Sequence, residues 1–362
     1  MDKEDVPAQD GISEYKAHNK RKILFLLALS LILIALYFIV LNIDLRYVSF
    51  GDMFNAIFNK GAAGNDPIVE VLIWTLYLPE VTSAILAGFA LGIAGVVMQC
   101  VLRNPLASPY TLGVSNAAAF GAALGIIIGG GSIIGQSTIV IDITNPYFVA
   151  INAFVWAMIA TLIIIALVKI TKISAEAMVL AGVAISSIFG AGISLLQYVS
   201  DTSLSAIVFW SFGSLTKANW SQLGLIAVIL ILSVIYFMYK RWDYNALDTG
   251  DDTAKSLGIN TNNLRLISLI LSAILTAIVV SFMGVIGFVG LLGPHIVRRL
   301  IGNDNRYVLI GSMLVGAMIL LVADCIGQNI ANFTIPVGII TAFLGGPLFI
   351  YILIRGYRRS PS

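Results

Sequence analysis

Residue types that could carry out chemistry are few in this chain, and their spacing forms no catalytic or metal-binding set. The two cysteines, Cys100 and Cys325, lie in apolar runs, and the two histidines, His18 and His295, are far apart. This spacing matches no zinc motif and indicates no disulfide framework. The sequence also contains no G-x-x-x-x-G-K-S/T, H-E-x-x-H or G-x-S-x-G pattern. We therefore predict no catalytic residue, metal or cofactor, and any ATP-driven work would need a partner subunit.

One ionisable residue, Asp324, lies inside an apolar run, where such groups are costly and often functional. We favour a structural, hydrogen-bonded Asp324, whose partner is Gln328, one helical turn further on, or a residue of another helix. The sequence shows no pair of carboxylates in mid-membrane. An ion-coupled secondary transporter, which would use such a pair, is therefore the weaker alternative function.

The amino-acid composition is typical of a protein whose helices lie within a membrane. Hydrophobic residues make up 59% of the 362 positions, charged residues only 11%, and the mean hydropathy is +0.95. An ordinary soluble domain has about 25% charged residues. A soluble globule and a disordered chain are both excluded, and the net charge of +2 gives no reason to expect nucleic acid as a partner.

The apolar runs predict an all-α polytopic membrane protein with about ten transmembrane helices in a compact bundle, since one span needs about 20 residues. Residues 1–22 form a polar N-terminal tail, 23–354 the transmembrane domain with a loop at 240–265, and 355–362 a C-terminal tail. We expect the first run to remain as an anchor and not to be cleaved as a signal. The predicted spans are 23–41, 78–102, 111–129, 147–168, 175–198, 221–239, 264–283, 286–297, 307–326 and 336–354.

The distribution of basic residues predicts that both termini are cytoplasmic. With ten spans, only Arg46, Lys60 and Lys217 of the 21 basic residues fall outside, as the positive-inside rule requires. The 286–297 run is too short to cross unaided, and a re-entrant segment there would instead place the C-terminus outside.

Small residues recur at helical spacing, as in the pairs Gly88/Gly92 and Gly121/Gly125. Small residues let helix backbones approach closely in lipid. We favour packing within one chain over a dimer contact for each pair.

The loop at 240–265 is the most informative connection. Asp248 and Thr249 could cap a short helix, Asp251 and Asp252 suit its N-terminus, and Gly258 would end it. Gly250, Ala254 and Leu257 would share one face. Because the loop carries four acids, an anionic lipid surface is disfavoured, and we expect this helix to bind a protein partner.

Four segments together carry a resemblance to a known family. They are AGFALGIAGVVMQCVLRNPLASP with TLGVSNAAAFGAALG at 87–125, NALDTGDDTAKSLGI at 245–259, GVIGFVGLLGPHIVRRLIG at 284–302 and PVGIITAFLGGPLFIYIL at 336–353. In this order they are similar to the FecCD family, the permease subunits of ABC importers for iron chelates and cobalamin.

The resemblance implies a multi-pass permease of the plasma or inner membrane that is not itself an enzyme. Two copies would form the path for a ferric siderophore, haem or a corrinoid. Two ATPase subunits would bind on the cytoplasmic side, and a solute-binding protein would deliver the cargo outside. The choice of chelate would lie largely in that binding protein.

The resemblance also assigns roles to residues by their position in the family's motifs. A cytoplasmic gate is implied at Asn104, Leu106, Ser174 and Ala175. Contacts with the ATPase are implied for Asn245, Leu247, Gly250, Ala254, Leu257 and Gly258.

The chain departs from the family before the second span. The family's usual R-L-P-R is Tyr77-Leu78-Pro79-Glu80 here, so the arginines thought to receive the binding protein are missing. We expect Tyr77 and Glu80 to lie at that docking site, with Glu80 facing a basic or neutral rim. The alternative is that Glu80 merely stabilises the helix N-terminus.

The topology can be tested by labelling. A single cysteine in place of Lys60 should react with a membrane-impermeant maleimide in intact cells, and one in place of Ser360 should not, because the basic residues hold that end inside. Labelling at position 360 in intact cells would contradict the ten-span topology.

Overall fold

The computed structural model of the chain describes residues 8–45, 48–61, 66–129, 132–134, 140–142, 146–171, 175–331 and 333–357. The predicted all-α class holds for these residues apart from one short antiparallel hairpin, in which Ser132 pairs with Asp142. The first half contains α1 (Ala8–Asp44), α2 (Phe50–Phe58), α3 (Pro67–Leu72), α4 (Leu78–Val101), α5 (Val114–Ile128), β1 (Ser132–Ile134), β2 (Val140–Asp142) and α6 (Pro146–Thr171). The second half contains α7 (Ala175–Val199), α8 (Leu204–Ser211), α9 (Trp220–Tyr239), α10 (Arg241–Thr249), α11 (Asp251–Ser256), α12 (Thr261–Met283), α13 (Val289–Ile301), α14 (Asn305–Asn329) and α15 (Val337–Tyr357).

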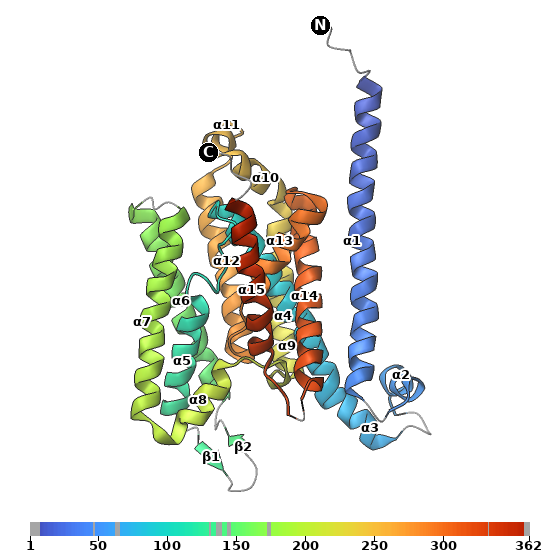
Figure 1. The fold of residues 1–362 in the computed structure, drawn as a ribbon, viewed down its shortest axis with the longest axis vertical. Helices are drawn as coiled ribbons and strands as arrows, with labels where there is room; N and C mark the ends of the chain where they lie inside the picture. The colour runs from blue at the N-terminus through green and yellow to red at the C-terminus, as the bar shows by residue number, and fades with distance from the viewer. Residues whose placement is uncertain are drawn as a thin grey trace.

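Each of the ten predicted spans coincides with a helix, namely α1, α4, α5, α6, α7, α9, α12, α13, α14 and α15. Among the described residues, seven helices are long and apolar enough to cross a membrane, and Val114–Ile128 and Val337–Tyr351 are shorter apolar helices. Figure 1 shows these helices running roughly along one direction, with α10 and α11 at one end and the β hairpin at the other.

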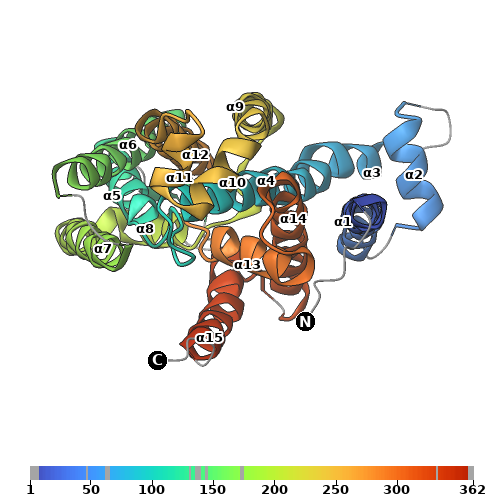
Figure 2. The ribbon, with the colours of Figure 1, turned by 90° about the horizontal axis from the view of Figure 1, so that it is seen from above.

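The helix α4 lies at the centre of the bundle and packs against α14, α12, α13 and α9. Seen from above in Figure 2, α1 and α2 lie at one end of the molecule and α6 and α7 at the other, while α9 and α15 project to opposite sides. The elements that carry the predicted coupling residues, α10 and α11, contact α4, α14 and α12, whereas α7, which carries the predicted gate residue Ala175, packs on α5, α6 and α8.

Several helix boundaries differ from the predicted ones, most of all at α1, which begins at Ala8 and not at residue 23. The second span continues N-terminally to Pro67 through a wide π turn at Ile73–Tyr77. Such a turn relieves the clash that Pro79 would cause in a regular helix. The predicted span at 286–297 corresponds to α13, which begins at Val289 and not at 286. Gly284 and Phe288 adopt positive φ angles of 77° and 65°, so the backbone between α12 and α13 is not helical.

The glycine pairs pack within the chain, as predicted. A Cβ atom at Gly88 would overlap the backbone of Gly316 and Ala317, and one at Gly92 would overlap Ser312, both in α14. One at Gly95 would overlap the backbone of Gly290 in α13. These contacts let α4 lie directly against two helix backbones.

This contact gives a stability prediction. Gly95→Ala should lower the melting temperature of the purified protein in detergent, because overpacking against a backbone costs about 1–3 kcal/mol. Gly224→Ala in α9 is the matched control, since no atom lies within 4 Å of the new Cβ. Equal melting temperatures for the two variants would contradict the close packing of α4 on α13.

Candidate functional site

The predicted coupling loop consists of two short helices, α10 and α11, which we call the 241–258 segment. They are separated by Gly250, whose φ of 135° no helix can contain. Asp251 and Asp252 occupy the first turn of α11 and Lys255 its last turn, as expected. Gly258, with a φ of 80°, follows the end of α11, also as expected. The predicted caps Asp248 and Thr249 are wrong, because the N-cap of α11 is Gly250.

The faces of this segment also differ from the predicted arrangement. Leu247 and Ala254 are 0% exposed and pack inside the chain, whereas Leu257 is 67% exposed. Gly258 is exposed and Gly250 half-buried. The expectation that Ala254 and Leu257 share a binding face is therefore wrong, because Leu257 already lies beyond the end of α11.

Asn245 anchors α10 to the turn before α14. Its Nδ2 donates to Asp304 Oδ1 at 3.0 Å, and its Oδ1 accepts from the Asn305 backbone N at 2.7 Å. Asn305 in turn donates to Asp248 Oδ2 at 2.7 Å. Burial alone would raise the pKa of Asp304, but hydrogen bonds from Arg306 and Asn245 outweigh it and lower this pKa to about 2. The carboxylate therefore stays charged and keeps these contacts over the physiological pH range.

Arg306 connects α10 with α1. Its guanidinium donates to both oxygens of Asp304 and lies 4.4 Å from the centre of the Trp242 ring. It also lies 3.3 Å from the Tyr15 hydroxyl of α1. Stacking of this kind holds a planar cation in one orientation. The 241–258 segment is thus fixed to the start of α14 and to α1.

The predicted gate residues after α4 lie in a compact connection, which we call the 102–113 loop. Asn104 is 5% exposed, and its Oδ1 accepts from the Leu106 backbone N at 2.9 Å. Leu106 is half-buried, and its carbonyl accepts from Thr111 Oγ1 at 3.1 Å. Ser174 lies outside the described residues. Ala175 begins α7, but its side chain is also outside what the structure describes.

Glu80 does not face outward, so the expectation that it meets a binding protein is wrong. Its side chain is 6% exposed, and Oε1 accepts from Gln328 Nε2 of α14 at 2.8 Å. The same Nε2 donates to Asp324 Oδ2 at 3.1 Å, so the hydrogen-bonded, structural Asp324 is confirmed. Tyr77 is half-buried at the end of the π turn.

This Glu80–Gln328–Asp324 cluster was missed in the sequence. The two carboxylates belong to different helices and share one amide, a contact that the local sequence does not predict. Glu80 precedes Gln328 by 248 positions, and no local pattern could reveal the contact. The only indication of this cluster in the sequence is Gln328, a polar residue one helical turn from Asp324.

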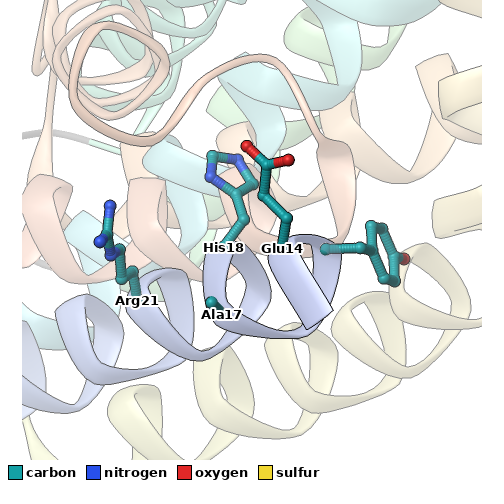
Figure 3. Close-up of a pocket in the computed structure, with 5 residues that line it drawn as sticks. Glu14, Ala17, His18 and Arg21 are labelled. Carbon is teal, nitrogen blue, oxygen red and sulfur yellow. The ribbon is translucent and has the colours of Figure 1, made fainter. Parts of the chain in front are cut away.

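A surface hollow of about 400 Å³ lies along α1. It is lined by Glu14, Tyr15, Ala17, His18 and Arg21, all from that helix, and Figure 3 shows Glu14 and His18 projecting from the same side of it. It contains no predicted site residue. In the described part of the chain, no three His, Cys, Asp or Glu residues lie close enough to hold a metal ion.

Comparison with known proteins gives one family match over most of the chain. Residues 31–355 match the model of the FecCD transport family. A Methanocaldococcus jannaschii protein named as an ABC transporter permease is 46% identical over 96% of this chain and 98% of its own length. The Fe(3+)-citrate import system permease YfmE of Bacillus subtilis is 34% identical over 92% of this chain and 96% of its own.

A solved structure shows the same fold. The structure described as an inward-facing conformation of a metal-chelate type ABC transporter matches with a TM-score of 0.77 and 31% sequence identity. The match covers 91% of this chain and 99% of that one. The chain therefore shares the overall fold of that transporter.

The buried cluster gives a stability prediction. Gln328→Leu should lower the free energy of unfolding by about 1–3 kcal/mol, because two buried carboxyl groups lose their shared donor. Thermal unfolding in detergent would measure it, with Gln197→Leu in the half-buried part of α7 as control. A Gln328→Leu variant as stable as wild type would show that the cluster does not hold α4 to α14.

Proposed function

The chain belongs to the FecCD transport family, and from this premise we propose that it forms the membrane path for a metal chelate in an ABC importer. As a multi-pass permease of this family it is not an enzyme. The cargo would be a ferric siderophore, haem or a corrinoid, handed over by a solute-binding protein. The observation that carries the proposal is the likeness to a metal-chelate type transporter over 91% of the chain.

The sequence supports a division of labour between subunits. It contains no phosphate-binding P-loop, so hydrolysis of ATP would occur in separate ATPase subunits. Ten helices at the predicted positions support a ten-span topology with both termini inside, with α5 and α13 short of the usual span length.

We place the path at an interface with a second copy of the chain. The helices α7 and α15 both border one side of the bundle in Figure 2. Both helices carry exposed large apolar side chains, including Ile188, which is 69% exposed, and Phe343, which is 75% exposed. A homodimer would cover such surfaces and enclose a wide path between the two copies. The cytoplasmic gate would be formed by Asn104, Leu106, Ser174 and Ala175.

The 241–258 segment is the proposed docking site for the ATPase. Its residues divide into two groups by exposure. Asn245, Leu247 and Ala254 hold the shape of the segment, whereas Leu257 and Gly258 are exposed and available to a partner. Gly250 sets the angle between the two helices.

Reconstitution tests the function. The chain would be co-expressed with candidate ATPase and binding-protein subunits from the same genome and placed in liposomes containing ATP. Uptake of radiolabelled ferric citrate, haem and cobalamin would then be measured with the loaded binding protein. Uptake of at least one chelate that needs ATP supports the proposal. Uptake that needs an ion gradient and no ATP would favour the alternative, an ion-coupled secondary transporter.

The docking site gives a separate prediction. Leu257→Glu should weaken assembly with the ATPase at least about tenfold, because an exposed apolar anchor at an interface often contributes 1–2 kcal/mol or more. Co-purification at a series of protein concentrations measures this. Asn262→Glu adds the same charge at an exposed position five residues further on and should assemble normally. Equal assembly of both variants would remove Leu257 from the interface.

A further inference from the structure

Asp251, the first residue of α11, faces two arginines from other parts of the chain. Arg265 of α12 donates to both carboxylate oxygens, from Nη1 to Oδ2 at 2.9 Å and from Nη2 to Oδ1 at 2.6 Å. Arg103 of the 102–113 loop places Nη1 3.7 Å from Oδ1. Asp251 therefore joins the 241–258 segment to α12 and to the loop that holds the predicted gate.

The two ion pairs differ in strength. The Arg265 pair is bidentate, the strongest geometry for an arginine and a carboxylate. The Arg103 pair is longer than a hydrogen bond, and the Arg103 side chain is 48% exposed. Exposed pairs of this kind contribute little to stability. The contact with α12 is thus permanent, whereas the contact with Arg103 can form and break.

The 102–113 loop is bonded to the end of α4 and within itself. The backbone N atoms of Arg103 and Asn104 donate to the carbonyls of Cys100 and Gln99, each at 3.0 Å. The side chains of Asn104 and Thr111 close the rest of the loop, as described above. Arg103 has a φ of 48°, a left-handed conformation that is unfavourable for a residue with a side chain. The surroundings hold this residue in a special conformation beside Asp251.

The other side of this loop lies directly against α7. A Cβ atom at Gly182 of α7 would overlap the carbonyl oxygen of Thr111. One at Gly113 would lie 2.9 Å from Ile185 and 3.1 Å from the backbone N of Ser186. Because backbone meets backbone here, a shift of the loop must displace α7, whose first residue is the predicted gate residue Ala175.

We propose that the Arg103–Asp251 pair transmits displacement of α11 to the 102–113 loop and to α7, and thereby couples the ATPase to the gate. The inference rests on the proposed function, in which the 241–258 segment binds the ATPase. Asp251 and Arg103 are positioning residues here, since their role is to connect two moving parts of the chain. This also explains why an acid in the proposed docking segment points back into its own chain.

The test follows the loop itself and needs no knowledge of the cargo. A cysteine replaces Leu106 in a Cys325→Ser background, and Cys100 is buried. The complex with the ATPase is purified, and the rate of maleimide labelling is measured with and without ATP and vanadate. In this reference complex, nucleotide should change the labelling rate. Arg103→Gly removes the guanidinium and suits the positive φ, while Arg103→Glu repels Asp251.

Both Arg103 variants should reduce the nucleotide-dependent change in labelling roughly 2- to 30-fold, the range expected for residues along a coupling route. ATP hydrolysis and co-purification should stay within about twofold, since such surface pairs add little to stability. Asp251→Asn weakens both the Arg103 and the Arg265 pairs, so it should reduce the change at least as much as Arg103→Gly. The control Arg21→Glu, exposed on α1, should behave as the reference complex.

The outcomes separate the two proposals. If the ATPase does not co-purify with the wild-type chain, the proposed function fails, and the inference fails with it. If it does co-purify, the inference alone is overturned by labelling that ignores nucleotide in the reference complex, by Arg103 variants that keep the full change, or by loss of assembly in those variants. Loss of assembly would mean that Arg103 supports docking and not transmission.

Discussion

The direct contact of the α4 backbone with α13 and α14 is the constraint on which the rest of the structure depends. Glycines at positions 88, 92 and 95 leave no room for a side chain between these helices. In a bilayer the hydrophobic effect does not hold helices together, so such close packing must do so. The C-terminal end of α4 is thereby fixed beside α10, where the Cys100 thiol lies 3.4 Å from the Tyr244 carbonyl. Both the 241–258 segment and the 102–113 loop begin from this fixed point.

Polar contacts at the two ends of the bundle serve different purposes. At the α10 end, Asn245, Asp304 and Arg306 fasten a short exposed segment to a long helix through charged hydrogen bonds. At the other end, Gln328 satisfies two carboxyl groups that are removed from water. The first set fixes the 241–258 segment to the start of α14 and to α1. The second keeps two helices in register where side chains could otherwise not be buried.

The sequence predicted what depends on local pattern. Apolar runs located the seven span-length helices and the two shorter apolar helices of the described residues, and glycine spacing located close packing. Local sequence pattern could not predict contacts between residues that are far apart in the chain. Nothing near Glu80 indicates Gln328, so its carboxylate was assigned to the surface. Helical spacing alone also placed Ala254 and Leu257 together, because it could not show that α11 ends at Ser256. Side-chain direction at helix ends is set by packing and not by period.

The wide turn at Ile73–Tyr77 has a consequence for how this protein can diverge. A π turn holds one residue more than an α turn, which rotates everything before it by about 100° relative to α4. Trp74 in this turn donates to the Ala56 carbonyl, and Trp220 donates to the Trp74 carbonyl, so the rotated part is tied to α2 and α9. Insertion or loss of a single residue here would re-aim the outer rim of the molecule and leave the buried contacts of α4 in place. Changes in chain length at this turn can therefore adapt the rim to a new partner without altering the buried contacts of α4.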